Sequence, residues 1–234
     1  MAVCRASRAS ELECRGFNER RFTMDGQGDP STSALLVLHY QNGLVRHEGV
    51  FAFSGTAAQV ERHMCLEKTA AVLEACRGAG MPVIYVNIEF RPGFPELKKP
   101  TYPLIESIQE RNAFIRGTWD AAVPDELKPE PEDIIVINFN SSAFSHTDLD
   151  CILRAKGVRH LFLAGIATNW VVESTTRYGA ELGYDITVLE DCCQGFSDEL
   201  HDFAIEKTLP YYASITKSAD FIATLSQAAV TAGR

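Results

Sequence analysis

Two polar residues, His39 and Asn138, directly follow short apolar runs, ALLVL (34–38) and IIVI (134–137). An imidazole titrates near neutral pH and is the commonest general acid or base in enzymes, so His39 could transfer a proton. Asn138 can donate and accept hydrogen bonds but carries no charge. Val171, which follows a third apolar run, has no heteroatom and cannot form a covalent intermediate. These residue types predict proton transfer and hydrogen bonding without covalent catalysis.

The elements that must position these residues are short apolar segments. Most of them are apolar throughout rather than alternating, which is typical of strands buried on both faces of a parallel sheet. The predicted strands are 34–38, 82–88, 133–138, 160–165, 185–189 and 213–216.

Segments with apolar residues at helical spacing separate these strands. The predicted helices are 57–79, 147–156 with Thr147 as its N-cap, 169–182 and 198–208. Strands that alternate with helices indicate right-handed βαβ units and a parallel sheet covered on both faces. We therefore predict an α/β fold with three αβα layers and a Rossmann-like parallel sheet of about six strands.

The carboxyl ends of parallel strands meet at one edge of a sheet, where ligands usually bind. His39, Asn138 and the turn that begins the predicted helix near Asn169 should therefore lie on one rim. The free N–H groups and positive dipole of that helix would suit a developing anion. Asn169, just before the helix, is predicted to cap it. The residues of this turn that we expect to bind substrate are Ile166, Ala167, Trp170 and Val171.

Four motifs resemble the isochorismatase-like cysteine hydrolases. ALLVLHYQN resembles their LLVIDMQN strand, and GIATNWVVEST resembles their GVATNVCVEST nucleophile turn. NFNSSAFSHTDLD resembles KxRxSAFxxTDLD, and LGYDITVLEDCC resembles LGYxVTVVxDAC. The resemblance runs from about residue 33 to the C-terminus, and the order of the motifs implies the isochorismatase-like fold.

The resemblance also implies an active site that this chain has changed. Typical members act on small amides or on isochorismate, and they use an Asp, a Lys and a nucleophilic Cys. These residues map onto His39, Asn138 and Val171, so all three differ here. The family's cis peptide before the nucleophile maps onto Ile166–Ala167, which together with backbone N–H groups could retain an anion hole.

The segment 90–130 interrupts the alternation of strands and helices and is rich in proline. Long excursions of this kind are often lids or subunit contacts, although a passive surface insertion is an equal alternative. Phe90, Arg91 and Trp119 are candidate walls of a substrate pocket. Glu89 ends the second strand and could pair with His39, which would raise the pKa of the imidazole.

The bulk composition limits the classes of function. A chain of 234 residues suits one domain, predicted here as 31–234, preceded by an arm at 1–30. A net charge of −9 gives no electrostatic reason to bind nucleic acid or an anionic membrane, and the N-terminus lacks the apolar core of a secretion signal. We therefore expect cytoplasmic residence.

The cysteines and the phosphate-binding motifs indicate no cofactor. The seven cysteines show no metal-like CxxC spacing and are expected to be reduced. One of the neighbours Cys192 and Cys193 falls where the family motif has a Cys outside the site, so both are expected to be buried and inert. No nucleotide cofactor is predicted, because the chain lacks GxGxxG and GxxxxGKS loops. No catalytic metal is predicted either, because NIEFRPGF offers Glu89 alone where the nicotinamide-hydrolysing relatives carry an Asp/His cluster.

Two functional hypotheses follow. In the first, the chain is a small-molecule enzyme in which His39 is the general acid or base of a non-covalent hydrolysis, elimination or isomerisation. In the second, it is a catalytically inactive relative that serves ligand binding or assembly. A nucleophile at Ser141 or Ser142 is a further alternative, for which the sequence shows no base partner. The family resemblance implies a homo-oligomer, a dimer or tetramer.

Overall fold

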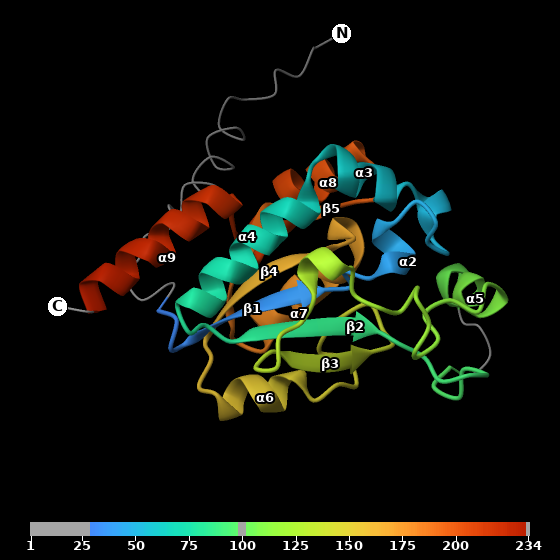
Figure 1. The fold of residues 1–234 in the computed structure, drawn as a ribbon, viewed down its shortest axis with the longest axis horizontal. Helices are drawn as coiled ribbons and strands as arrows, with labels where there is room; N and C mark the ends of the chain where they lie inside the picture. The colour runs from blue at the N-terminus through green and yellow to red at the C-terminus, as the bar shows by residue number, and fades with distance from the viewer. Residues whose placement is uncertain (1–28, 98–101, 233–234) are drawn as a thin grey trace, which may run out of the picture.

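A computed structural model describes residues 29–97 and 102–232 of the chain. Most of the predicted arm at 1–30 lies outside these residues, and the division into an arm and a domain stays a prediction. The described part is built around one parallel sheet in the order β3-β2-β1-β4-β5-β6 (Figure 1). The strands are β1 Ser33–Leu38, β2 Val83–Ile88, β3 Ile134–Asn138, β4 His160–Ile166, β5 Asp185–Gln194 and β6 Ser214–Thr216.

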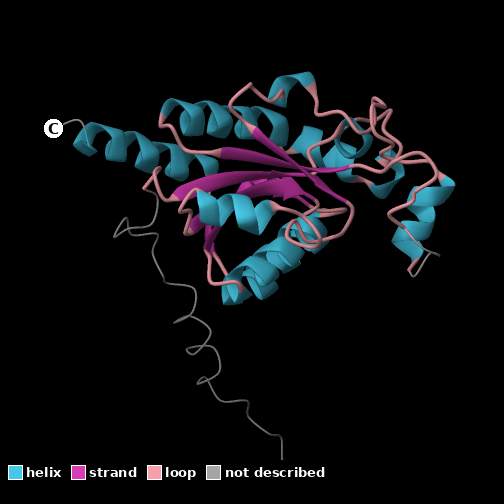
Figure 2. Cartoon of the chain, turned by 90° about the horizontal axis from the view of Figure 1, so that it is seen from below, coloured by secondary structure: helices cyan, strands magenta, loops and turns pink. Residues whose placement is uncertain are grey.

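Helices cover both faces of this sheet, as the view from below shows (Figure 2). Apolar side chains of α4 and α9 pack on one face, and those of α6 and of the segment around α7 pack on the other. The predicted three-layer α/β fold is therefore confirmed. The helices are α2 Asn42–Val45, α3 Thr56–Arg62, α4 Cys65–Gly78, α5 Pro103–Glu110, α6 Leu149–Ala155, α7 Glu173–Glu181, α8 Asp198–Phe203 and α9 Ser218–Ala232.

Short turns of other helix types join these elements. The π-helical turns are η3 Thr168–Val172 and η4 Ala204–Thr208, and the 3-10 turns are η1 Ala52–Ser54, η2 Asp125–Leu127 and η5 Leu209–Tyr211. The turn η3 leads directly into α7, so the predicted helix 169–182 starts with a widened turn. The predicted helix 198–208 likewise consists of two parts, α8 followed directly by the π-helical turn η4.

Two predicted elements have different bounds. The predicted helix 57–79 is two helices, because Met64 takes a left-handed conformation with φ 52°. This break lets His63 and Arg62 both reach the Asp198 carboxylate on α8. The predicted strand 185–189 continues to Gln194 as β5, past an irregularity in its pairing with β4. In addition, the predicted helices do not include α9.

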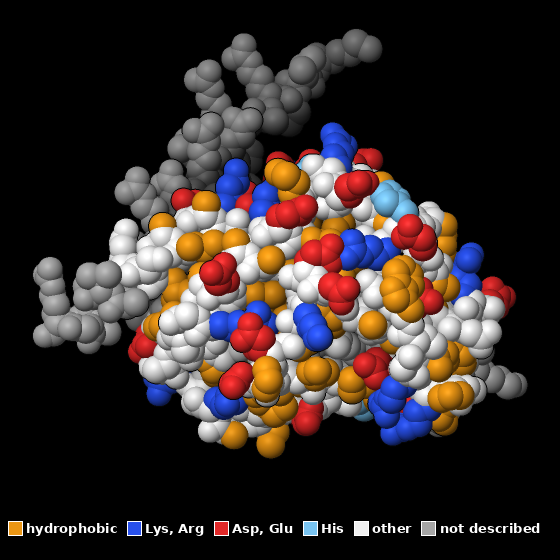
Figure 3. All heavy atoms as spheres, viewed as in Figure 1, with side chains coloured by type: hydrophobic (Ala, Val, Ile, Leu, Met, Phe, Trp, Pro, Cys, Tyr) orange, Lys and Arg blue, Asp and Glu red, His pale blue; other side chains and the backbone are white. Residues whose placement is uncertain are grey.

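On the face of the molecule drawn in Figure 3, acidic and basic side chains are interspersed and form no basic patch. In the described part of the chain, no helix is both long enough and apolar enough to span a bilayer.

Gly165 lets β4 approach β1 and η3 closely. A Cβ at this position would lie 2.7 Å from the Leu38 Cβ and 3.0 Å from the Val172 Cγ2. We expect Gly165→Ala to lower the free energy of unfolding by about 1–3 kcal/mol, the usual effect of overpacking a core. Urea denaturation followed by circular dichroism measures it. Gly78→Ala is the matched control, since nothing lies within 4 Å of a Cβ there. Equal stability of the two variants would contradict this account of Gly165.

Candidate active site

His39 lies at the carboxyl end of β1 in an unusual setting. Its backbone is left-handed, with φ 54°, a conformation that is uncommon for residues other than glycine. The side chain is fully buried, and neither Nδ1 nor Nε2 has a hydrogen-bond partner among the described residues. Buried polar atoms nearly always have a partner, so the unpaired imidazole is the most unusual polar group at this rim.

Burial lowers the pKa of His39 from its ordinary value of 6.5 to about 3, while the neighbouring Asn138 side chain opposes the shift. Although Asn138 lies near the ring, no hydrogen bond joins the two side chains. The imidazole is therefore neutral at physiological pH. The neutral imidazole can accept a proton as a general base. It cannot act as a general acid in the imidazolium form, because that form is not populated.

The predicted pairing of Glu89 with His39 is wrong. The Glu89 carboxylate instead accepts a hydrogen bond from Arg116 Nε at 3.1 Å, and Arg116 lies in the segment between β2 and β3. No described carboxylate bonds to the imidazole, so no such partner offsets the effect of burial, which lowers the pKa of His39.

Asn138 ends β3 and holds the loop that follows it. Its Oδ1 accepts the backbone N–H of Asn140 at 2.6 Å, and its Nδ2 donates to the carbonyl of Ser142 at 2.8 Å. Asn138 thus caps backbone groups of this loop. Because the amide is buried and bound in this way, it has little capacity left for a ligand.

The turn after β4 separates its side chains between the two faces of the sheet. The peptide Ile166–Ala167 is cis, as predicted. Ile166 and Ala167 pack in the core on the α4 face, whereas Val171 packs in the core on the α6 face. Val171 is fully buried and serves as ordinary packing in the first turn after β4.

Trp170 is the residue of this turn that meets His39. The two rings lie edge to face with centroids 6.4 Å apart, and the indole is half-buried. Its Nε1 donates to Ser141 Oγ at 2.5 Å. No histidine bonds to Ser141 or Ser142 in the described part of the chain, so neither serine has the base it would need as a nucleophile. The structure thus brings His39, Asn138 and Trp170 together.

The predicted cap at Asn169 is wrong. The turn has no side-chain cap, and Asn169 Oδ1 is buried without a hydrogen-bond partner in the described chain. The reason is local: η3 begins at Thr168, so Asn169 already lies inside the helical turn.

The candidate residues of the excursion are partly committed to other contacts. Phe90 is fully buried and packs on Phe94, and Arg91 forms an ion pair with Glu96 at 2.6 Å. The side chain of Trp119 is half exposed, so it remains available to a ligand or a subunit. Their roles as pocket walls stay predictions.

Gln41 was missing from the predicted site although it organises the rim. Its Nε2 donates to the carbonyls of Ile88 and Ala121, at 2.8 and 2.7 Å, and its Oε1 accepts the N–H of Ile88 at 2.8 Å. This fully buried amide ties the ends of β1 and β2 to the excursion. The signal in the sequence was a polar QN pair that follows the apolar strand after His39 and Tyr40.

The described cysteines are free thiols, and four of the five are buried. Burial raises the pKa of Cys192 to about 12 and that of Cys193 well above its ordinary value. The expectation that both are buried is confirmed. A thiolate, the reactive form, is therefore disfavoured at both positions.

The lowered pKa of His39 predicts a pH dependence of stability. Between pH 6.5 and 3 the unfolded chain binds a proton at this residue that the folded chain excludes, so acid favours unfolding. His160, whose pKa burial lowers to about 4, acts in the same direction. We expect the free energy of unfolding to fall between pH 7 and pH 5. Each of the two histidines contributes up to about 1.4 kcal/mol for each pH unit.

Urea denaturation at pH 7, 6 and 5 tests this dependence. His39→Asn should flatten the slope, because asparagine tolerates the left-handed backbone and does not titrate. His47→Asn is the control, since the His47 side chain is 59% exposed. An unchanged slope in His39→Asn would show that the buried imidazole does not resist protonation.

The chain is similar in sequence to a known protein family. The isochorismatase domain model matches residues 33–220. The ureidoacrylate amidohydrolase of Caulobacter vibrioides is 35% identical over 86% of this chain and 94% of its own. The ureidoacrylate amidohydrolase of Rhizobium rhizogenes is 32% identical over 86% and 87%.

Solved structures agree with this relationship. A cysteine hydrolase from Pseudomonas syringae superposes with a TM-score of 0.74 at 23% identity, over 85% of this chain and 94% of the other. The N-carbamoylsarcosine amidase of Thermoplasma acidophilum has a TM-score of 0.63 at 26% identity, over 80% and 96%. The domain model and these relatives show that the chain belongs to the isochorismatase family.

Proposed function

We propose that the chain is a small-molecule hydrolase of this family that works without a thiol nucleophile, with His39 as its proton acceptor. One observation carries the proposal: a neutral, buried imidazole lies at the carboxyl end of β1, beside Trp170, with no hydrogen-bond partner among residues 29–97 and 102–232. Such a group is costly to bury unless a ligand or water molecule bonds to it during function.

The chemistry follows from the side chains present. A water molecule would attack the carbonyl carbon while its proton passes to a ring nitrogen of His39. The developing oxyanion would lie at the start of η3, where a helical turn presents N–H groups. The N–H of Trp170 is not one of its donors, because it already donates to the Ala167 carbonyl at 3.1 Å. Collapse of the tetrahedral intermediate then returns the proton to the leaving amine. Val171 takes no part, since it offers no nucleophile.

The relatives suggest the class of substrate. Their names describe enzymes that act on ureidoacrylate and on N-carbamoylsarcosine, which are both carbamoyl compounds with a carboxylate. We infer that this chain takes a small carbamoyl acid. A substrate carboxylate near His39 would favour the imidazolium and raise its pKa from about 3, making the bound imidazole a stronger base.

The second candidate is a non-catalytic ligand-binding protein. Three observations favour it: Asn138 is bound to its own loop, Val171 belongs to the core, and an imidazole of pKa about 3 is a weak base. Calorimetric binding of ureidoacrylate without release of ammonia would support this candidate over the hydrolase.

Thiol alkylation tests the proposed mechanism. The chain is treated with iodoacetamide and ammonia release from ureidoacrylate is then measured. We expect the same rate before and after alkylation, also in the variant Cys151→Ser, which lacks the exposed described thiol. Inactivation in proportion to alkylation would refute a thiol-free mechanism, and absence of both binding and turnover would refute the proposal for this substrate.

A further inference from the structure

Ser141, in the loop after β3, holds the indole of Trp170. Its Oγ accepts the indole N–H at 2.5 Å, across a distance of 29 residues in the sequence. An indole has a single N–H donor, so this bond uses its whole capacity for hydrogen bonding. The tilt of the Trp170 ring is therefore set by the position of one serine hydroxyl.

The Trp170 ring is a neighbour of His39 that solvent reaches. Trp170 is partly exposed, whereas the His39 side chain is fully buried, and the two rings meet edge to face with centroids 6.4 Å apart. The Phe196 ring lies near the indole as well, at 6.3 Å. Because neither nitrogen of the imidazole has a hydrogen-bond partner among the described residues, packing alone holds that ring. A movement of the indole would therefore expose the imidazole that it contacts.

Asn138 fixes the position of Ser141. Its amide binds the N–H of Asn140 and the carbonyl of Ser142, which are the residues on either side of Ser141. These two bonds fix the backbone of the loop where it presents the Ser141 hydroxyl. The buried amide thus acts on the rim through the loop that it caps.

Ser141 also faces the segment between β2 and β3. Burial raises the pKa of Tyr102, the residue before α5, and the Ser141 hydroxyl opposes this shift, so the two side chains lie near each other. A serine hydroxyl can accept one hydrogen bond and donate another. Ser141 can therefore hold the indole while its own proton points towards Tyr102.

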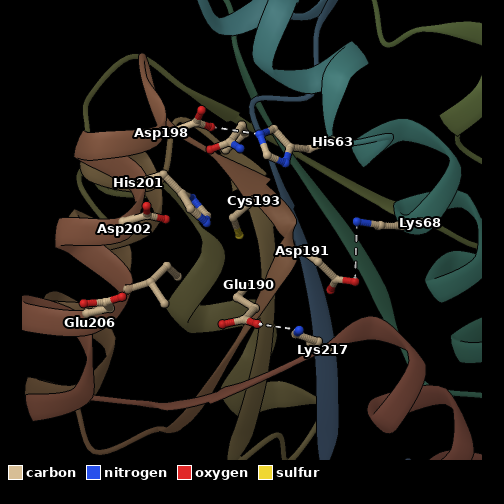
Figure 4. A pocket seen from close by; sticks show the side chains of 12 residues that line it. His63, Lys68, Glu190, Asp191, Cys193, Asp198, His201, Asp202, Glu206 and Lys217 are labelled. Atoms are coloured by element: carbon tan, nitrogen blue, oxygen red, sulfur yellow. Dashed lines mark hydrogen bonds and ion pairs between the residues drawn. The ribbon is translucent and has the colours of Figure 1, made fainter.

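A different side chain holds the start of η3. Thr168 Oγ1 bonds to His201 Nδ1 at 2.8 Å, and Figure 4 shows His201 on α8 with its ring directed towards Cys193. In the described part of the chain, neither a hydrogen bond nor a ring contact joins His201 to Trp170. The turn therefore has two side-chain anchors, of which only Ser141 bonds to the residue beside His39.

We propose that Ser141 is a positioning residue of this site, which holds the indole of Trp170 over His39 and so excludes bulk water from the imidazole. The role rests on the function proposed for His39. Its test uses the chain without substrate, so absence of turnover would count against that function and not against this role.

The His39 pKa reports on the access of water. Burial is the main cause that lowers it, and the Asn138 side chain opposes the shift. No charged side chain of the described residues contributes to it. Water that reaches the ring should therefore change this pKa directly.

The fluorescence of Trp170 tests the first step. The chain has two tryptophans, so Trp119→Phe leaves Trp170 alone. In this background we expect Ser141→Ala to shift the emission to longer wavelength and to increase quenching by acrylamide, because the freed indole meets water. Ser141→Thr keeps the hydroxyl and should retain the native emission. Ser145→Ala removes a hydroxyl of the same loop that bonds to no other described residue, and it should change nothing.

NMR of the His39 ring nitrogens tests the second step. We expect Ser141→Ala to raise the pKa of His39 from about 3 towards its ordinary value of 6.5, while Ser141→Thr and Ser145→Ala keep it low. His201→Leu removes the other anchor of η3 and should leave emission and pKa native.

Three outcomes would overturn the proposal. The first is a native emission in Ser141→Ala. The second is an altered emission with an unchanged His39 pKa, since the indole would then not cover the imidazole. The third is an equal change of both signals in His201→Leu, which would show a general loosening of the turn.

Discussion

Replacing Gln41 with alanine is expected to lower the free energy of unfolding by about 3–9 kcal/mol, since each buried backbone group left without its partner costs roughly 1–3 kcal/mol. The variant leaves three such groups, the N–H and carbonyl of Ile88 and the carbonyl of Ala121. Because domains are stable by only about 5–15 kcal/mol, we expect a partly unfolded protein at room temperature. Urea denaturation followed by circular dichroism measures the loss.

Two further variants separate hydrogen bonding from side-chain volume. Gln41→Glu keeps the size and one acceptor but loses both N–H donors, so it should also be strongly destabilised. Gln109→Ala makes the same truncation in α5, where the side chain bonds to no other described residue, and should cost little. If Gln41→Ala were no less stable than Gln109→Ala, Gln41 would not be the link between β1, β2 and the excursion.

Replacing His39 with asparagine is expected to reduce turnover of ureidoacrylate by 10²- to 10⁴-fold, the usual contribution of a general base. The fold should survive, because asparagine tolerates the left-handed backbone that the φ of 54° requires. In the native chain the rate should rise with pH as the bound imidazole loses its proton. Ammonia release measured across the pH range provides both results.

The control for this prediction is His160→Gln. His160 is also buried with a lowered pKa, but it begins β4 at the opposite edge of the sheet and bonds to Thr187. Turnover in this variant should equal that of the native chain at neutral pH. A native rate in His39→Asn would remove His39 from the mechanism and leave the ligand-binding alternative.

The sheet was predictable because its strands are buried on both faces. Continuous apolar runs such as ALLVL have no other stable location in a chain of this composition, and five of the six strands match the prediction within one residue at each end. The sixth, β5, is longer than predicted because Glu190 and Asp191 interrupt its apolar pattern.

The sequence predicts where the candidate site residues lie in the fold, but it does not predict which groups their side chains contact. Topology places His39 and Asn138 at one edge of the sheet, because both follow parallel strands. The partners of Glu89 and Gln41 depend on the path of the excursion between β2 and β3, for which the sequence shows no regular pattern. Similarly, the pKa of His39 depends on how completely the fold excludes water from it, which no spacing of residues encodes.

The state of the His39 imidazole is the centre of this account, and NMR of the ring nitrogens measures it directly. We predict that His39 stays neutral down to about pH 4 in the free chain and that saturating ureidoacrylate shifts its ring nitrogens and raises its pKa. A free imidazole that titrates near 6.5, or ring nitrogens that do not respond to the bound ligand, would contradict it.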